Sequence, residues 1–274
     1  MGSPTAPQAG GIALVLPAHN EAATVAAVID RTPDTVAGIA VSCVVVDDGS
    51  TDATAELARL AGATVIGHGA RRGLGAAVRT GLRHAVRCGV RVVAFCDADG
   101  EYAPEELGNL VLPILRGDAD YVVGSRFAGT IRRMHPHRRA GNHVLTWALR
   151  RLADTAITDG QSGYRALSAD AARTAEIVHD YNYAQVLTLN LLRQGLRYAE
   201  VPISYAFREH GRSFVQLHHY LRAVVPAIWR ELAASRADAP VDSVGAVAAA
   251  IAPAARPSRQ RSSAAGGSVP SLWR

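Results

Sequence analysis

Three carboxylates occur at alternate positions where a short apolar segment ends. Asp97, Asp99 and Glu101 follow residues 92–96, which form an uninterrupted apolar run. Charges placed beside a buried strand are costly unless a cation or a ligand holds them. Mg²⁺ and Mn²⁺ prefer oxygen ligands and often bridge to phosphates, so this spacing indicates a metal–phosphate site. The alternative is an acidic loop that precedes a helix, because a helix N-terminus also favours negative charge.

Polar side chains follow three further apolar runs in the same way. They are His19 after residues 12–16, Asp48 after residues 41–46 and Arg126 after residues 121–123. If these runs are parallel strands of one sheet, their carboxyl ends form a single crevice at one edge. The acids after residues 41–46 can then hold a base or ribose. The acids after residues 92–96 can hold a metal, and the metal can bind a diphosphate. The four clusters together predict a nucleotide-diphosphate site.

The apolar runs alternate with segments of helical periodicity, which is typical of βαβ units and a mostly parallel sheet. We expect strands at residues 12–16, 41–46, 64–66, 92–96 and 121–123, and helices at 21–31, 53–61, 76–87 and 104–116. Asn20 has the type of side chain that caps the N-terminus of the first of these helices. The sequence therefore predicts an α/β, doubly wound fold, at least to residue 124.

The pattern changes after residue 126. Residues 127–141 hold several arginines and histidines among Gly and Pro, which indicates an unpatterned basic loop. Beyond it we expect helices at 142–153, from 170 and at 183–193, strands at 164–167, 197–201 and 203–207, and an apolar helical face over 214–234. Tyr164 is expected in the core, whereas Arg165 suits a surface ion pair equally well.

The two ends of the chain differ in composition from its centre. Residues 1–10 are rich in Gly, Pro and Ala, and residues 236–274 in Ala, Pro, Ser and Gly, which predicts a flexible leader and a disordered tail. The remaining residues, 11–235, make a single domain. We expect a nucleotide-binding half at 11–125 and an acceptor half at 126–235.

The composition restricts the function. The 274 residues are 49% hydrophobic and 19% charged, with a net charge of +5, and no lysine occurs. Arginine suits phosphate and carboxylate ligands, but the Walker A motif needs lysine, and no glycine of a dinucleotide fingerprint follows the first strand. Nucleic acid is a poor second reading, because the basic loop lacks interleaved aromatic residues and any recognition-helix motif. The three cysteines are odd in number and lack metal spacing, which fits a reducing cytoplasm, and we find neither a signal peptide nor a membrane span.

An ordered set of motifs adds a family resemblance. The motifs are VLPAHNE at 15–21, VVDDGSTD at 45–52, RGLG at 72–75, DAD at 97–99, GSR at 124–126 and QSGYR at 161–165. Over about residues 11–235 the chain resembles the family-2 glycosyltransferases of GT-A fold. Within that family it is most similar to the polyprenyl-phosphate (dolichyl-phosphate) mannose and glucose synthases.

The resemblance implies roles for individual residues. The nucleoside and donor would be bound by Pro17, His19, Glu21, Val46, Asp48 and Arg72, and Mg²⁺ or Mn²⁺ by Asp97, Asp99 and Glu101, although Gln is common at the last position. The phosphates would be bound by Arg126, by Arg138 or Arg139 from a mobile basic loop that closes over the donor, and by Arg208, His210 or Arg212. Asp99, Arg126 and Asp159 would be the catalytic residues. Asp159 would be a general base for a hydroxyl acceptor, or alternatively a turn residue that caps residues 160–162.

The function implied is a metal-dependent, inverting glycosyltransferase that uses a UDP- or GDP-sugar. The expected acceptor is polyprenyl phosphate, and the alternative is a hydroxyl of a soluble small molecule or saccharide. Remoter alternatives are a sugar-nucleotide pyrophosphorylase and a non-catalytic nucleotide-sugar-binding protein. We expect a cytoplasmic protein, with peripheral contact at the inner face of the membrane if the acceptor is a lipid.

Overall fold

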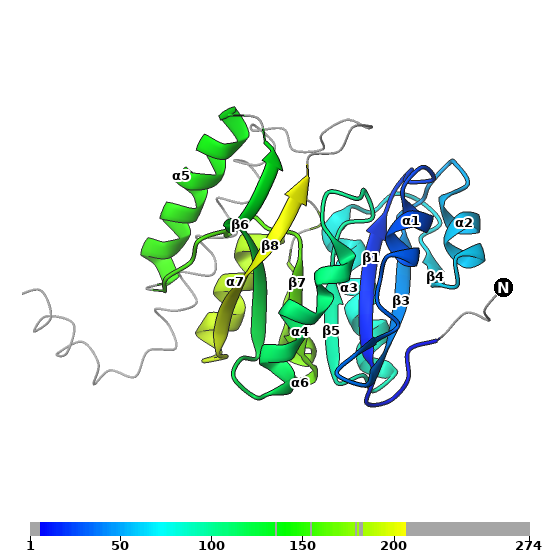
Figure 1. Cartoon of the computed structure of the whole chain (residues 1–274), viewed down its shortest axis with the longest axis horizontal. Helices are drawn as coiled ribbons and strands as arrows, with labels where there is room; N and C mark the ends of the chain where they lie inside the picture. The colour runs from blue at the N-terminus through cyan, green and yellow to red at the C-terminus, as the bar shows by residue number, and fades with distance from the viewer. Residues whose placement is uncertain (1–5, 135, 154, 179, 181–182, 207–274) are drawn as a thin grey trace, which may run out of the picture. The chain divides into compact units, whose positions relative to one another are not determined.

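The central element of the fold is an eight-stranded sheet. The computed structural model describes residues 6–206 except 135, 154, 179, 181 and 182. Seven strands lie in the order β2-β3-β1-β5-β7-β6-β8, and β4 pairs with β3 (Figure 1). Their bounds are β1 Ile12–Ala18, β2 Thr35–Val36, β3 Ile39–Asp47, β4 Thr64–Gly67, β5 Val92–Phe95, β6 Tyr121–Arg133, β7 Arg165–Ser168 and β8 Tyr198–Ala206.

Most of the strand pairs are parallel. β1 pairs in parallel with β3 and β5, β3 with β4, and β6 with β8. β7 is antiparallel to both of its neighbours, β5 and β6, and the two-residue β2 is antiparallel to β3. This mixed, mostly parallel sheet confirms the predicted α/β architecture.

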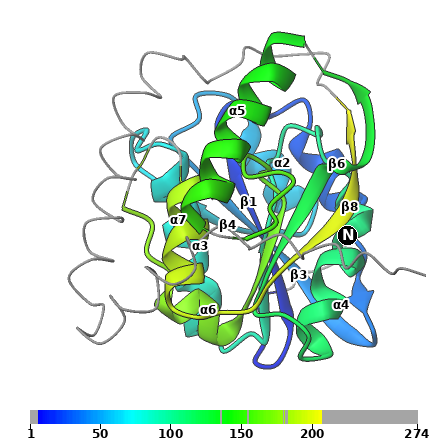
Figure 2. The same ribbon diagram turned by 90° about the vertical axis from the view of Figure 1, so that its left-hand side faces the viewer.

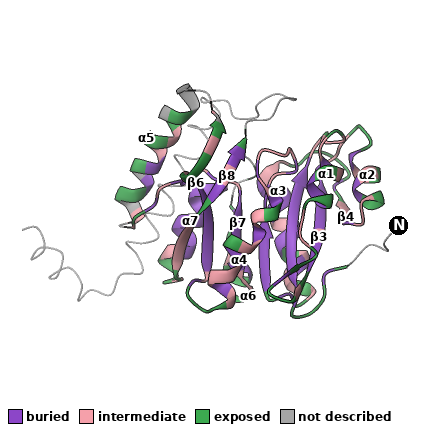
Figure 3. Cartoon of the chain, in the orientation of Figure 1, coloured by how far each residue is buried: buried purple, intermediate pink, exposed green. Residues whose placement is uncertain are grey.

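Helices cover both faces of the sheet. They are α1 Val25–Asp30, α2 Thr54–Leu60, α3 Leu74–Arg87, the 3₁₀ turn η1 Pro104–Glu106, α4 Leu107–Leu115, α5 Pro136–Ala153, α6 Ala169–Thr174 and α7 Ala184–Arg193. Figure 2 shows α3, α6 and α7 on one face and α4 on the other. Alternate residues of β1 enter the two cores, Leu14 and Leu16 on the α4 side, and Ala13 and Val15 on the α3 side. Coverage of both faces explains why the central strands are continuous apolar runs and are buried (Figure 3).

The first helix begins later than the sequence predicts. α1 starts at Val25 with Thr24 at its N-cap, so Asn20 is not the cap. Asn20 instead adopts a φ of 56°, and its side-chain oxygen accepts a hydrogen bond from the Thr51 backbone N–H at 2.8 Å. An Asn side chain tolerates this left-handed conformation. The residue therefore joins two loops instead of starting a helix.

The expected basic loop at 127–141 is the second correction. β6 continues to Arg133, and α5 begins at Pro136. The strand is extended because residues beyond Ser125 pair with β8 after a register shift, Thr130 opposite Ser204 and Ile131 opposite Tyr205. A Cβ at Gly129 would lie 2.1 Å from the Ile203 carbonyl oxygen, so only glycine allows the strands to approach this closely.

The described elements belong to one compact unit. The boundary expected at residue 125 falls inside β6, so one sheet runs through both predicted halves. Residues 207–274 are outside the described part, and with them the expected apolar helical face at 214–234 and the tail. No helix of the described residues has the length and apolarity to cross a membrane.

Candidate active site

The loops after β1 and β3 are joined by hydrogen bonds. The Asp48 backbone N–H donates to the Ala18 carbonyl oxygen at 2.8 Å. A His19 ring nitrogen lies 3.0 Å from the Asp48 carbonyl oxygen, and the Glu21 N–H donates to the Thr54 hydroxyl at 2.8 Å. The two polar clusters that the sequence places after separate strands therefore form one structural unit.

The Asp48 carboxylate holds a third loop. It accepts the backbone N–H groups of Arg72 and Gly73, each at 2.8 Å, and one of its oxygens lies 2.8 Å from Nδ1 of His68. Burial raises the pKa of Asp48, but the hydrogen bonds from His68 and the two amides outweigh it and lower the pKa below its usual value. Asp48 is thus a charged anchor for the loop that leads into α3.

Glycine is required at the start of α3. Gly73 has a φ of 99°, and a Cβ there would lie 2.6 Å from the Asp180 carbonyl oxygen. The Arg72 side chain is exposed beside it. The backbone of residues 72–73 is therefore fixed to Asp48. The role of the exposed Arg72 side chain in donor binding stays a prediction.

Three other expected donor-binding residues lie on β1 and β3 or just after. Pro17 and Val46 are opposite each other in the β1–β3 register, and both are buried. The Val46 side chain packs in the core on the α3 side of the sheet. Glu21 is half-buried, and its carboxylate accepts a hydrogen bond from the Thr24 hydroxyl at 3.1 Å. Their roles in nucleoside binding stay predictions.

The acidic loop after β5 is attached to β8. The Asp99 carboxylate accepts the Glu101 backbone N–H at 3.0 Å, while the Glu101 carboxylate accepts the Tyr205 hydroxyl at 2.6 Å. Tyr102 and Tyr205 form an antiparallel bridge, and the Ala206 N–H donates to the Glu101 carbonyl oxygen at 2.9 Å. Burial first, and then Glu101, raises the pKa of Tyr205, so this phenol stays a hydrogen-bond donor.

Two carboxylates of this loop could hold a divalent cation only if other ligands complete its shell. In the described part of the chain no three His, Cys, Asp or Glu side chains are grouped closely enough to hold a metal alone. Mg²⁺ is usually held by one or two carboxylates and completes its shell with water and substrate phosphates. Asp97 and Asp99 are half-buried at the strand end and would be such a pair, whereas the Glu101 carboxylate accepts the Tyr205 hydroxyl. Their role as metal ligands stays a prediction.

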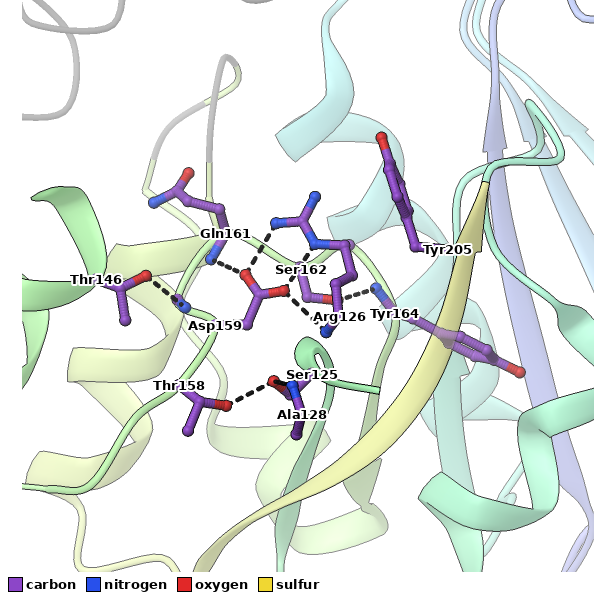
Figure 4. Close-up of polar contacts among 12 residues, drawn as sticks. Ser125, Arg126, Ala128, Thr146, Thr158, Asp159, Gln161, Ser162, Tyr164 and Tyr205 are labelled. Atoms are coloured by element: carbon purple, nitrogen blue, oxygen red, sulfur yellow. Dashed lines mark hydrogen bonds and ion pairs between the residues drawn. The ribbon is translucent and has the colours of Figure 1, made fainter. Parts of the chain in front are cut away.

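Arg126 and Asp159 form a buried ion pair. Nε and Nη2 of Arg126 donate to the two oxygens of Asp159 at 2.7 and 2.8 Å (Figure 4). The side chains are 7% and 0% exposed. The guanidinium also lies 5.2 Å from the centroid of the Tyr205 ring, with Tyr205 on the side away from Asp159. Burial lowers the pKa of Arg126, but Tyr102 and the Asp159 carboxylate raise it above its usual value, so the guanidinium remains charged.

The turn that carries Asp159 is held from several sides. Glu200 on β8 accepts the backbone N–H groups of Thr158 at 2.8 Å and of Asp159 at 3.1 Å. Arg165 is fully buried, not at the surface, and donates from Nε to the Ser162 carbonyl oxygen at 2.7 Å and from Nη2 to that of Gly160 at 3.1 Å. Charged side chains of both signs thus fix the Asp159 carboxylate in place. Tyr164 is buried in the core, as predicted.

The remaining predicted phosphate-binding residues are placed differently or lie beyond the described part. Arg138 and Arg139 belong to α5, so they lie on a helix and not on the expected mobile loop. Arg139 is exposed. Arg208, His210 and Arg212 are outside the described residues.

Four side chains of this region were missed by sequence reasoning. His68 follows β4, so the strand-end rule that found Asp48 would have found it too. Tyr102, Tyr205 and Glu200 have no comparable signal. Their partners are distant in the sequence. Tyr205 contacts Glu101, about a hundred residues earlier, and Glu200 contacts Thr158, about forty residues earlier.

The comparison with protein families identifies the chain. The model of glycosyl transferase family 2 matches residues 13–174. The chain belongs to glycosyl transferase family 2. Among curated relatives of this transferase, polyprenol monophosphomannose synthase of Mycolicibacterium smegmatis is 32% identical over 212 residues, 73% of this chain and 79% of that protein. Undecaprenyl-phosphate mannosyltransferase of Micrococcus luteus is 31% identical over 221 residues, 73% of this chain and 85% of that protein.

Solved structures agree with the fold of the transferase. Glucosyl-3-phosphoglycerate synthase from Mycobacterium tuberculosis, in complex with Mn²⁺, UDP and glucosyl-3-phosphoglycerate, is 27% identical with a TM-score of 0.67. The match covers 81% of this chain and 80% of that one. The transferase therefore has the GT-A fold, and the resemblance to polyprenyl-phosphate sugar synthases is confirmed.

Proposed function

We propose that this family 2 transferase moves a sugar from a UDP- or GDP-sugar to polyprenyl phosphate, with inversion at the anomeric carbon. The names of the M. smegmatis and M. luteus relatives, which refer to polyprenol and undecaprenyl phosphate, support the acceptor class. The UDP bound in the M. tuberculosis structure supports a nucleotide-sugar donor.

The Arg126–Asp159 ion pair is the observation that favours a phosphate acceptor over a hydroxyl acceptor. A hydroxyl acceptor needs a carboxylate within hydrogen-bond reach to take its proton. Asp159 is the buried carboxylate expected for that task, but it accepts two hydrogen bonds from the Arg126 side chain and others from the Arg126 and Gln161 amides. Both oxygens of the carboxylate are therefore already engaged, and an acceptor hydroxyl would have to compete with Arg126 for them. An acceptor that arrives as a phosphate anion needs no base, and the positive charge of Arg126 attracts it.

The reaction then balances without a proton acceptor. A phosphate oxygen of the acceptor forms a bond to the anomeric carbon, and the bond from that carbon to the donor phosphate oxygen breaks. The nucleoside diphosphate leaves with the electron pair. Arg126 stabilises the negative charge on the phosphates, and it acts strongly because a buried guanidinium is poorly screened by water.

A divalent cation has a defined place in this proposal. Asp97 and Asp99 would hold Mg²⁺ or Mn²⁺, which supplies positive charge to the leaving diphosphate when it is bound. The Mn²⁺ in the M. tuberculosis structure supports a cation of this kind. Asp48, through the fixed backbone of residues 72–73, and His19 would position the donor on the other side of the crevice.

An acceptor assay tests the proposal. The protein is incubated with radiolabelled UDP- or GDP-sugars, Mn²⁺ and polyprenyl phosphate, and the mixture is extracted with organic solvent. We expect label to enter the organic phase only with the acceptor present and to be lost in Asp99→Asn. If all turnover stays in the aqueous phase, the lipid acceptor is wrong.

A soluble phosphorylated acceptor is the second candidate. It is favoured by the solved structures of glucosyl-3-phosphoglycerate synthase with phosphoglyceric acid, which match 81% of this chain. The ion pair fits this candidate less well, since the glycerate hydroxyl carries a proton that must be removed. The same assay with 3-phosphoglycerate in place of the lipid distinguishes the two, because the product then stays in water.

A further inference from the structure

Helix α5 exposes apolar side chains. Val144 and Trp147 are 65% and 60% exposed, and they are two of the four large hydrophobic residues with high exposure in the described part of the chain. They lie three positions apart, so they share one side of the helix. A fold that buries its apolar residues well elsewhere thus presents a tryptophan and a valine together to solvent.

The same side of α5 is cationic. Arg150 and Arg151 are exposed next to this pair, and the Arg151 guanidinium lies 5.5 Å from the centroid of the Trp147 ring. Arg139 is exposed nearer the start of the helix. Not one Asp or Glu occurs in residues 121–153, a stretch that contains seven arginines. We call Val144, Trp147, Arg150 and Arg151 the outer face of α5.

The inner face of α5 packs against the turn that carries Asp159. Leu149 is 1% exposed and clusters with Ile157 and Leu189. The Thr146 hydroxyl accepts the Gly160 backbone N–H at 3.2 Å. Gly160 follows Asp159 directly, so this hydrogen bond joins α5 to the turn whose carboxylate binds Arg126. The outer face therefore has a fixed relation to the proposed acceptor site.

We propose that the outer face of α5 docks on an anionic lipid bilayer. Helices that lie in a membrane interface combine apolar and aromatic side chains with Arg and contain few acids, which is the composition of α5. Anionic lipids attract each arginine near the surface, and the tryptophan ring suits the headgroup level. The proposal deepens the proposed function and rests on it, because a polyprenyl phosphate acceptor is anchored in a bilayer.

The charge of the helix argues against a second copy of the chain as the occupant. In a twofold contact the same patch faces itself. Arg150 and Arg151 would then meet arginines, and α5 has no carboxylate to pair with them. A lipid surface that carries negative charge removes this repulsion.

Vesicle binding tests the proposal. The full chain is sedimented with vesicles of phosphatidylcholine alone and of phosphatidylcholine with phosphatidylglycerol. We expect binding to the anionic vesicles and at least a tenfold loss in Val144→Ser/Trp147→Ser. The matched control is Leu60→Ser, which changes a residue that is 66% exposed on α2 and should bind like the wild type.

The arginines are tested separately. Arg150→Gln/Arg151→Gln should weaken binding to the anionic vesicles by about fivefold per arginine and reduce its dependence on salt. Arg59→Gln, which removes an exposed arginine from α2, is the control. Binding that is equal for all these variants and the wild type would overturn the proposal.

Fluorescence reports the position of the helix directly. The chain has three tryptophans, Trp147, Trp229 and Trp273, so Trp229→Phe/Trp273→Phe leaves only the one on α5. Its emission should shift to shorter wavelength on the anionic vesicles. An unchanged spectrum with bound protein would show that another surface docks. Self-association in solution that Trp147→Ser abolishes would identify a second copy as the occupant and overturn the proposal.

An activity measurement separates this proposal from the proposed function. With a short-chain, water-soluble polyprenyl phosphate and no vesicles, Val144→Ser/Trp147→Ser should keep wild-type turnover. With long-chain acceptor in vesicles it should lose turnover in parallel with binding. If the wild type never uses the short-chain acceptor, the proposed function is contradicted. In that case, loss of vesicle binding in Val144→Ser/Trp147→Ser would still support docking through α5.

Discussion

At the scale of single residues, the Arg126–Asp159 pair concentrates opposite charges in a buried place. The carboxylate is fully buried and receives both side-chain hydrogen bonds in a bidentate arrangement. Removal of either partner leaves the other charge buried and uncompensated, which is strongly destabilising in general. We therefore expect Asp159 to position Arg126, and its role as a general base stays a prediction that the geometry does not favour.

Chemical rescue tests this positioning role. Arg126→Ala should lower turnover by about 10²–10³-fold, the usual effect of losing one group that stabilises transition-state charge. Added guanidinium ion should restore part of the activity, because Asp159 and the Tyr205 ring still form a site for a planar cation. Turnover is measured with increasing guanidinium chloride.

The controls of this experiment discriminate between the two roles of Asp159. Urea has the same shape without the charge and should not rescue, and the same concentration of NaCl corrects for ionic strength. Arg126→Ala/Asp159→Asn should not be rescued. Equal rescue with and without the carboxylate would mean that Asp159 does not position the cation.

Glu101 is expected to act through Tyr205 and not as an essential metal ligand. Glu101→Gln keeps an oxygen that can accept the Tyr205 hydroxyl, whereas Glu101→Ala removes it. The Gln variant should retain turnover and stabilisation by Mn²⁺ plus UDP within about twofold, and the Ala variant should lose part of its stability, by about 1 kcal/mol. Thermal unfolding with and without the ligands measures both. If Mn²⁺ plus UDP no longer stabilises Glu101→Gln against thermal unfolding, Glu101 is a metal ligand after all.

The lowered pKa of Asp48 predicts a dependence of stability on pH. A carboxyl group with a folded-state pKa below its usual 3.8 stabilises the fold above that value and loses the effect as pH falls through the lower folded-state pKa. Asp48→Asn has no such charge and should unfold more easily by about 1–3 kcal/mol at neutral pH. Denaturant titrations should show the gap between wild type and variant narrowing below about pH 4. Asp118→Asn, at an exposed position, should show no such gap.

At the scale of elements, the sequence predicted those strands that are covered on both faces. β1 and β5 are continuous apolar runs, and β3 is nearly so, because α-helices bury each side of them, and a run of this kind is visible without a structure. The outer part of β6 was not predictable. Its residues are mixed in character, and the strand persists only because β8, about seventy residues later, pairs with it.

The same distinction holds for the candidate site. Strand-end polarity predicted Asp48, Asp97 and Arg126 as site residues, because the carboxyl ends of parallel strands lie at one edge of a sheet. It could not show that Asp159 would be bound to Arg126, because the two are 33 residues apart and come together only through the turn after α5. The sequence pattern also gave no sign that Glu101 accepts a hydrogen bond from Tyr205.

Gly163 limits the space around the acidic loop. A Cβ at this position would lie 2.8 Å from an Asp97 carboxylate oxygen and 3.3 Å from the Tyr102 hydroxyl. Gly163→Ala should therefore displace Asp97 and abolish stabilisation by Mn²⁺ plus UDP, with only a modest loss of fold stability. Gly69→Ala, which has nothing within 4 Å of the added atom, is the matched control. A metal response equal to that of the wild type would mean that Asp97 does not contribute to the site.

At the scale of the whole molecule, one sheet joins the regions expected to bind donor and acceptor. β5 belongs to the first half of the described chain, yet it pairs directly with β7 from the second. β6 crosses the expected boundary at residue 125. The acidic loop after β5 and Arg126 on β6 are thereby held by one sheet, with β7 between the two strands.

This continuity predicts that the first half cannot fold alone. A fragment of residues 1–134 lacks β7 and β8, so β5 would keep β1 but lose its other neighbour, and β6 would lose both of its neighbours in the sheet. The fragment should show no cooperative thermal unfolding by circular dichroism, whereas the full chain should unfold with a major transition common to both regions. Native-like unfolding of the fragment would show that the halves are independent.

The antiparallel strand β7 also has a consequence for synthesis on the ribosome. β5 is complete at Phe95, but its partner Arg165 is made 70 residues later. Chain growth at about 5–20 residues per second leaves this edge open for several seconds. All four residues of β5 are buried in the finished sheet, so an apolar strand edge is exposed to other chains during that interval. Because this non-local pairing forms slowly, substitutions in β7 that delay it should increase chaperone dependence and lower the yield at high temperature. This should hold even for substitutions that leave the finished fold intact.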